Sequence, residues 1–270
     1  MAATPPQHPI IRGDALDFYL SQGYYRMHQD LFTCRFLPLD DDLYTVHWLR
    51  LRLAAVHYGP AQRRLLRLNE PFIVTIRPFQ LTAEYEALYA LYRSTITFDA
   101  PETVEAFLLA GATHNVFSTH VLEVRDKEQL IAVGIFDSGA RSLAGIMNFY
   151  HPAYRRYSLG KYLMLLKTNY ARLHQKTYYY PGYLVHGYSK FDYKLFPCLA
   201  ATEVFDALNG GWLPFNWNTV AAHSAELLTG WPRKTWPRTT LAKQAAQLPN
   251  GPPADKLPGQ PWELIGTEAR

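Results

Sequence analysis

The chain has 270 residues, a net charge of +4 and 48% hydrophobic residues. This hydrophobic content is typical of a chain that folds around buried cores, and it excludes a disordered protein. The apolar runs are far shorter than the roughly 18–20 residues of a membrane-spanning helix. The first residues, Met-Ala-Ala-Thr-Pro-Pro, also lack the basic and apolar regions of a secretory signal. We therefore expect a cytoplasmic protein with no membrane partner.

The first 70 residues predict a small β-rich module. A short helix is expected over residues 14–22, followed by strands over 23–34 and 43–56, where apolar and polar residues alternate. A basic cluster before the apolar strand 72–76 has two interpretations, a solvated helix face or a contact with nucleic acid. Its arginines are Arg63, Arg64 and Arg67.

Two helices and three strands follow. Thr82 is a good N-cap for the first helix, and residues 101–109 have the Pro start and Gly end of a second. The strands 116–124, 131–136 and 143–150 are joined by short polar links, as antiparallel hairpins require. Because residues 131–136 are apolar on both faces, we expect them to form the central strand of a covered sheet.

A helix over residues 159–174 is predicted next, with Ser158 as its N-cap. The strand 177–185 contains Pro181-Gly182, which indicates a bulge or an edge position. Residues 216–270 are expected to be a Pro-rich, largely disordered tail.

The order of these elements predicts an α/β (α+β) fold with a mixed, mainly antiparallel sheet flanked by helices. It matches the core order of the N-acetyltransferase (GNAT) superfamily, so we expect a GNAT-like fold. The predicted division is a small N-terminal module (1–70), an acyltransferase domain (71–215) and the tail (216–270).

The loop before helix 159–174 is a candidate anion site. Gly160 leaves the backbone N–H groups of the helix start accessible, and Arg155, Arg156 and Lys161 add positive charge. An ordinary capped helix with a basic surface loop is the alternative. Acetyl-coenzyme A enzymes carry Gln/Arg-x-x-Gly-x-Gly/Ala at this loop, and the second glycine is absent here. Another acyl donor is therefore favoured.

Aromatic and cationic residues are unusually mixed around this loop. The chain has 19 tyrosines, concentrated between Tyr150 and Tyr193 and interleaved with arginine and lysine. Such a surface can stack on bases and neutralise phosphates. The two cysteines, Cys34 and Cys198, have no Cys-x-x-Cys partner, so we expect no thiolate metal site.

Several sequence blocks between residues 17 and 215 resemble the aminoacyl-tRNA–protein transferases, which include the arginyl and bacterial leucyl enzymes of the N-degron pathway. The blocks appear in the family's order and spacing. They are Gly23-Tyr-Tyr-Arg26, Ile131-Ala-Val-Gly-Ile-Phe-Asp137, Leu143-Ala-Gly-Ile-Met-Asn-Phe-Tyr-His-Pro152, Ser158-Leu-Gly160, Tyr180-Pro-Gly-Tyr183 and Lys190-Phe-Asp-Tyr-Lys194.

The chain departs from the family pattern at four places. His151 replaces an Asp, Pro181 replaces a Leu, and only Arg26 remains of an Arg pair. Of the Cys-rich cluster that many members carry, only Cys34 is present, so we expect no metal, cluster or other cofactor.

The resemblance implies that the protein transfers an amino acid, Arg or Leu, from aminoacyl-tRNA to the N-terminal amine of an acceptor protein. The N-terminal residue of the acceptor is expected to be acidic, and Arg26 is expected to bind its side chain. DNA is not an expected partner. Asp137 is the candidate that orients an amine, with a turn residue as the alternative. Tyr157 and Tyr183 are the candidates for the oxyanion or the terminal adenosine, with core packing as the alternative. The expected tRNA contacts are Arg155, Arg156, Ser158, Gly160, Lys161, Lys190 and Lys194.

Two other functions fit the same fold. One is an acetyl-coenzyme A-dependent N-acetyltransferase, which differs in the acyl carrier. The other is a non-catalytic relative that binds tRNA or degrons, which the changes at His151 and Arg26 leave open.

Overall fold

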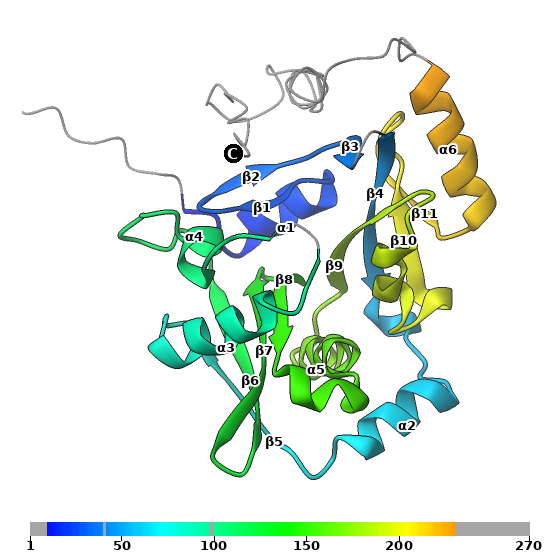
Figure 1. Cartoon of the computed structure of the whole chain (residues 1–270). Helices are drawn as coiled ribbons and strands as arrows, with labels where there is room; N and C mark the ends of the chain where they lie inside the picture. The colour runs from blue at the N-terminus through cyan, green and yellow to red at the C-terminus, as the bar shows by residue number, and fades with distance from the viewer. Residues whose placement is uncertain (1–9, 40–41, 98–99, 230–270) are drawn as a thin grey trace, which may run out of the picture.

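The structure is a computed structural model that describes residues 10–39, 42–97 and 100–229 (Figure 1). Its centre is a nine-stranded sheet with the order β11-β10-β4-β9-β8-β7-β6-β5, in which β3 also pairs with β4. The strands are β1 (Tyr25–Met27), β2 (Asp30–Phe32), β3 (Phe36–Leu39), β4 (Asp42–Arg52), β5 (Ile73–Pro78), β6 (Thr119–Asp126), β7 (Gln129–Ser138), β8 (Ser142–Tyr150), β9 (Tyr178–Val185), β10 (Thr202–Phe205) and β11 (Trp212–Pro214).

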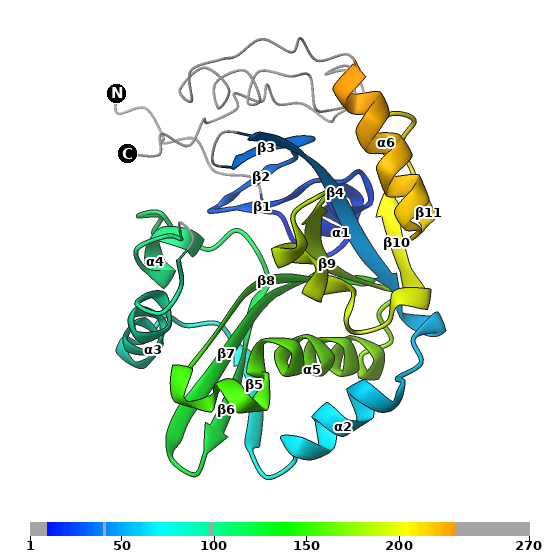
Figure 2. The same ribbon diagram turned by 45° about the vertical axis from the view of Figure 1, so that its right-hand side comes forward.

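Helices cover both faces of this sheet (Figure 2). On one face, Leu159 and Leu163 of the long helix pack against Leu143. On the other face, Tyr85 and Val104 pack against Val133. The α-helices are α1 (Asp14–Ser21), α2 (Pro60–Leu68), α3 (Ala83–Arg93), α4 (Val104–Leu108), α5 (Leu159–Leu173) and α6 (Trp217–Thr229), and 3₁₀ turns span Leu53–Ala55, Pro152–Tyr157, Ser189–Leu195 and Leu199–Ala201.

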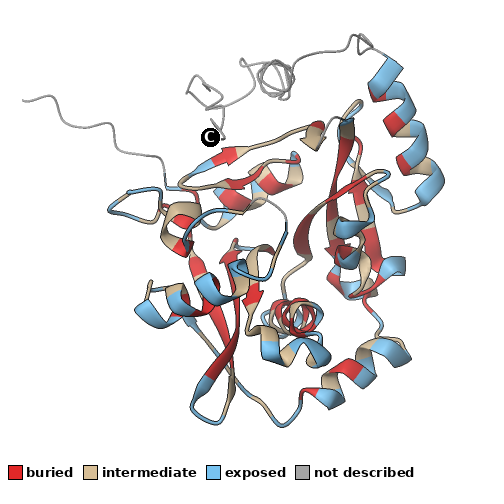
Figure 3. Ribbon diagram, in the orientation of Figure 1, coloured by how far each residue is buried: buried red, intermediate tan, exposed pale blue. Residues whose placement is uncertain are grey.

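The three hairpin strands predicted between residues 116 and 150 are present as β6, β7 and β8. β7 lies between the other two and is buried from Leu130 to Asp137, which confirms that it is a central strand covered on both sides (Figure 3). The predicted mixed, mainly antiparallel sheet flanked by helices is confirmed as well.

The N-terminal segment enters the same sheet. β4 pairs with β9 on one side and with β10 on the other. The boundary predicted at residue 70 therefore separates strands of one sheet, and the division into domains stays a prediction. The single strand predicted over residues 23–34 is wrong, because the chain reverses near His28, whose φ is 55°, and forms the hairpin β1–β2.

Two further predictions need correction. β9 lies between β4 and β8, so the edge position suggested by Pro181-Gly182 is wrong, and the bulge is right, since the β4–β9 register shifts between Leu49 and Leu51. The predicted tail begins with the helix α6, whose Val220 packs on β4 and β10 residues, and residues 230–270 lie outside the described part. None of the helices in the described ranges has the length and apolarity needed to cross a bilayer.

Candidate active site

The sheet opens at its centre. β8 and β9 form the one parallel pair among the described strands, and their pairing runs only from Ser142↔Tyr178 to Ala144↔Tyr180. Beyond this point β8 stays paired with β7, and β9 stays paired with β4. The divergence creates space between two neighbouring strands, in the middle of an otherwise continuous sheet.

A cavity of about 160 Å³ lies at this divergence. Cavities of about 150 Å³ hold a molecule the size of benzene, so this one has room for a single medium-sized side chain. Apolar and aromatic residues are the more numerous in its lining, but polar atoms make up the larger part of its surface, and the lining includes no carboxylate. The lining residues are Gly145, Ile146, Met147, Asn148, Met164, Tyr179, Pro181, Tyr193 and Lys194.

Tyr25 fixes the point at which the strands separate. Its hydroxyl lies 2.5 Å from the carbonyl oxygen of Gly145 and 2.8 Å from that of Tyr180. These carbonyls belong to the two diverging strands, and the hydroxyl supplies the donor that a continued ladder would have supplied. The buried ring of Tyr25 stacks on Trp48, with ring centroids 5.1 Å apart. Tyr25, on the β1–β2 hairpin, therefore fixes the spacing of β8 and β9 at the point where they diverge.

Lys194 places a buried amine in the cavity wall. Its Nζ donates to the carbonyl oxygen of Tyr183 at 2.7 Å and lies 4.4 Å from the ring centre of Phe191. Burial lowers the pKa of Lys194 to about 7, although the surrounding rings favour the ammonium form. Both the ammonium and the free amine are thus populated near neutral pH. Lys194 is only 9% exposed, so a contact with tRNA phosphates would require its cover to move, and that contact stays a prediction.

Lys167, which is not part of the cavity lining, fixes the orientation of Asn148, which is. Its Nζ donates to the carbonyl oxygen of Ile135 at 2.7 Å and to Oδ1 of Asn148 at 2.8 Å. Since Oδ1 of Asn148 is occupied in this way, the amide nitrogen is the end left to donate to a ligand. Burial lowers the pKa of Lys167 to about 7, against the attraction of Asp137, which raises it.

The predicted basic loop lies at the start of α5. Arg155 and Arg156 are exposed on the turn Pro152–Tyr157, and Lys161 is exposed in the first turn of the helix. Lys161 also lies over the ring of Phe196, with its Nζ 4.9 Å from the ring centre. These three cations are together on the surface, as the sequence indicates.

The local structure of this loop differs from the prediction in two respects. Ser158 has left-handed backbone angles and makes no side-chain capping hydrogen bond, so its predicted role as a side-chain cap is wrong. Gly160 has ordinary room, since an added Cβ would meet the ring of Tyr150 at 3.5 Å. His151, which replaces the family's Asp, accepts a hydrogen bond from the Ala153 amide at 3.2 Å and so caps the turn as a carboxylate would.

The two candidate tyrosines lie in different places. The ring of Tyr157 packs on Phe72 outside the cavity lining, and Arg156 donates to its hydroxyl at 2.9 Å. Tyr183 is half-buried on β9, where its ring lies 4.8 Å from Nζ of Lys194. Lys190 is exposed on the segment that leads into the cavity wall. The catalytic roles of both tyrosines stay predictions.

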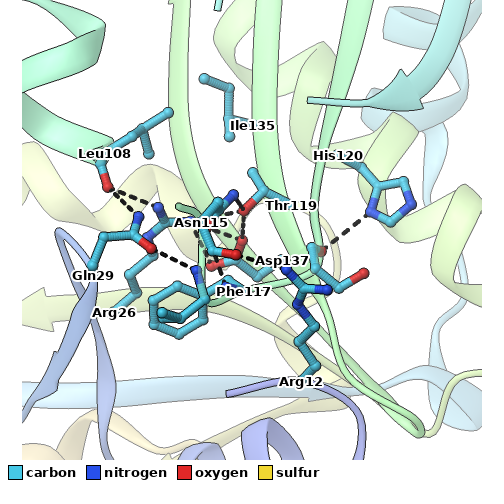
Figure 4. Close-up of polar contacts among 12 residues, drawn as sticks. Arg12, Arg26, Gln29, Leu108, Asn115, Phe117, Thr119, His120, Ile135 and Asp137 are labelled. Carbon is cyan, nitrogen blue, oxygen red and sulfur yellow. Dashed lines mark hydrogen bonds and ion pairs between the residues drawn. The ribbon is translucent and has the colours of Figure 1, made fainter. Parts of the chain in front are cut away.

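Arg26 and Asp137 are brought together, but as a closed pair (Figure 4). The guanidinium lies 3.0 Å from the carboxylate, with side chains 2% and 0% exposed. Arg26 also donates to the hydroxyl of Thr119 and to the carbonyl oxygen of Leu108. Arg26 is enclosed and most of its donors are occupied inside the protein, so a contact with an acceptor carboxylate would require this pair to open, and that contact stays a prediction. Asp137 is likewise enclosed, and its role in orienting an amine stays a prediction.

Sequence reasoning missed the residues that shape the cavity from within. Lys167 carried a signal, because it is a lysine at an apolar position of an amphipathic helix. Asn148 and Tyr193 carried none, since their importance depends on the strand divergence. In the described part of the chain, no three His, Cys, Asp or Glu side chains gather so as to hold a metal ion, and both cysteines are free.

A cavity that opens between parallel strands and contains a near-neutral amine, beside a basic helix start, suits acyl transfer from a polyanionic carrier. The family described as "Arginine-tRNA-protein transferase, C terminus" matches residues 84–196, which include all the cavity-lining residues. The aspartate/glutamate leucyltransferase of Xanthomonas euvesicatoria pv. vesicatoria is 28% identical over 178 residues, covering 62% of this chain and 68% of that protein. These matches support a relationship to the aminoacyl-tRNA–protein transferases over residues 84–196.

Other similar proteins are more distant or match a shorter stretch. The aspartate/glutamate leucyltransferase of Hahella chejuensis is 31% identical over 140 residues, covering 50% of this chain and 58% of that protein. The structure of L-PGS from Bacillus licheniformis covers 64% of this chain and 50% of that chain, with a TM-score of 0.39 and 11% identity. The structure of FemX covers 66% and 61%, with a TM-score of 0.37 and 11% identity.

Proposed function

We propose that the protein transfers leucine from leucyl-tRNA to the N-terminal amine of proteins that begin with Asp or Glu. The observation that carries this proposal is the cavity between β8 and β9, which is sized for one side chain and has Lys194 in its wall. The names of the relatives, aspartate/glutamate leucyltransferases, support the same substrates.

The cavity lining favours leucine over arginine. A buried guanidinium would need a carboxylate, which the lining lacks, whereas a leucyl side chain needs none and can contact Ile146, Met147 and Met164. Lys194 would also repel a second cation whenever it is protonated. A leucyl side chain in the cavity places its ester carbonyl near Asn148 and Lys194.

The reaction is aminolysis of an ester that is already activated. The acceptor nitrogen attacks the ester carbonyl carbon, a C–N bond forms, and the bond to the ribose oxygen breaks. Lys194, as the free amine, takes the proton from the attacking nitrogen and returns it to the leaving ribose oxygen. The amide nitrogen of Asn148 donates to the oxyanion, and Lys167 holds that amide in place.

The RNA approaches from the basic start of α5. Arg155, Arg156 and Lys161 are exposed there, and the first N–H groups of the helix are without a side-chain cap. Such a helix start attracts phosphate. We assign binding of the acidic acceptor side chain to Lys190 and not to the enclosed Arg26. Lys190 is an exposed cation on the segment Ser189–Leu195, which also carries Lys194 of the cavity wall.

The test is a transfer assay with labelled aminoacyl-tRNA and peptides that begin with Asp, Glu or Ala. We expect leucine to be transferred to the first two and little arginine to be transferred to any. Transfer of arginine alone would overturn the assignment of the amino acid, and equal use of the Ala peptide would overturn that of the acceptor. No transfer from either tRNA, together with a thermal shift by coenzyme A, would favour an N-acetyltransferase instead.

A further inference from the structure

The helix α2 has two contrasting faces. Leu65 is buried and packs with Leu66 in the same cluster as α5 residues, on the side of the helix that carries the anchoring Gln62 and Asn69. The opposite stripe is exposed and strongly basic. It consists of Arg63, Arg64 and Arg67, which lie three and four positions apart. We call this stripe the α2 ridge.

The anchors of α2 attach it to residues that already hold cations. Nε2 of Gln62 donates to the carbonyl oxygen of Phe196 at 2.6 Å, and the ring of Phe196 lies beneath Lys161. Nδ2 of Asn69 donates to the carbonyl oxygen of Tyr157 at 3.1 Å, and the guanidinium of Arg156 lies over the ring of that tyrosine at 4.8 Å. Gln62 and Asn69 therefore attach α2 to residues that contact Lys161 and Arg156, and Figure 2 shows α2 running alongside α5.

The combined surface has little negative charge to neutralise it. Residues 53–72 contain one carboxylate, Glu70, and residues 151–166 contain none. Within the described ranges, Arg64 and Arg67 form no ion pair and donate no side-chain hydrogen bond, whereas Arg63 donates to the carbonyl oxygen of Tyr58. A ligand can therefore bind these two guanidinium groups without breaking an ion pair or a hydrogen bond within the described part of the protein.

We propose that the α2 ridge binds the phosphate backbone of the tRNA, extending the contact that begins at α5. This inference rests on the proposed function for its choice of RNA. The helix has nine residues and is about 13 Å long, whereas duplex nucleic acid carries a charge about every 1.7 Å along its axis. The ridge thus faces several phosphates at once. It contacts the body of the RNA and leaves the cavity to the aminoacyl end.

A membrane surface fits the ridge less well. A helix that lies on a bilayer presents apolar residues toward the lipid and cations at the border. In α2 the leucines at positions 65 and 66 face the protein, and the exposed apolar residues are Pro60, Ala61 and Leu68, of which only Leu68, 46% exposed, is large. Phosphates in an RNA backbone require no apolar insertion.

The experiment compares two variants that each remove two positive charges. Arg64→Gln/Arg67→Gln changes the ridge, and Arg93→Gln/Lys127→Gln changes exposed cations at the end of α3 and in the β6–β7 turn. Binding of deacylated tRNA is measured by fluorescence anisotropy over a range of KCl. We expect the ridge variant to lose roughly 1.4–1.8 from the slope of log K against log salt, because two contacts contribute about 0.7–0.9 each. The control should keep the parental slope, and thermal melting should show both variants folded.

An unchanged slope in the ridge variant would overturn the inference. So would loss of binding to phosphatidylglycerol vesicles in this variant without any change in tRNA binding. The proposed function is tested separately by leucine transfer from leucyl-tRNA, measured with the parental protein. A parental protein that transfers no amino acid, combined with a reduced slope in the ridge variant, would reject the proposed reaction and keep the RNA contact.

Discussion

The amine of Lys194 offers the sharpest test of the proposed reaction. Its pKa of about 7 means that protonation controls how much free amine is present at neutral pH. Substituting Lys194→Met removes the base and the hydrogen bond to the Tyr183 carbonyl. Lys194→Arg is the matched variant, because it keeps a long cationic donor but a guanidinium does not lose its proton.

The expected effect of pH follows from this pKa. Because both Lys194 and the acceptor α-amine react as free amines, the transfer rate should rise with pH and level off only above about pH 8. At pH 6 only about a tenth of Lys194 is the free amine, so the lysine alone should lower the rate about tenfold, in addition to the effect of the acceptor. Loss of a general base lowers rates by about 10²–10⁴-fold. We expect a loss in this range for both variants, since neither supplies a base.

The assay is single-turnover transfer of leucine from saturating leucyl-tRNA between pH 5.5 and 8.5. The acceptor α-amine titrates too, at about 7.7–8.0. An inflection at about 7.7–8.0 that is left in Lys194→Met therefore belongs to the acceptor, and one near pH 7 belongs to Lys167, whose pKa is also about 7. Near-parental rates in Lys194→Arg or Lys194→Met would refute the role of the lysine as base and leave it a packing or charge contact.

Other substitutions test the frame around the cavity. Gly145→Ala places a Cβ 2.8 Å from the hydroxyl of Tyr179, so we expect about 1–3 kcal/mol of destabilisation and reduced transfer, while Gly160→Ala, with room at 3.5 Å, should be neutral or stabilising in urea unfolding. Tyr25→Phe removes the donor shared by two strand carbonyls and should cost about 1–3 kcal/mol, with transfer falling by more than stability alone explains. Arg26→Ala leaves a buried carboxylate unpaired and should cost about 3–5 kcal/mol; a urea midpoint equal to the parent's would contradict the buried pair.

Much of the fold follows from local sequence. The links between β6, β7 and β8 are too short for anything but hairpins, and the apolar stripe of α5 predicts its buried face. The exposure of Arg155, Arg156 and Lys161 was also predictable, because they lie on a turn and on the polar side of a helix.

Other features depend on contacts between distant residues. The chain turns inward at Ser189–Leu195, so Lys194 is buried although its neighbours look like a charged surface segment. Arg26 and Asp137 meet only after the β1–β2 hairpin packs on β7. No local sequence pattern predicts this buried ion pair, and each of the two residues, taken alone, looks like a side chain that is free to bind substrate.

The position of β4 has a consequence for how the protein is made. Its partners β9 and β10 are synthesised long after it, so on a ribosome only the end of β4 that pairs with β3 has a partner while most of the chain emerges. Pairing over such a sequence separation is slow, and an unpaired strand edge invites association with other chains. A fragment of residues 71–215 would lack β4, so the edge of β9 that pairs with β4 would be exposed. We therefore expect this fragment to aggregate rather than fold as an independent enzyme, which light scattering after dilution from urea would reveal.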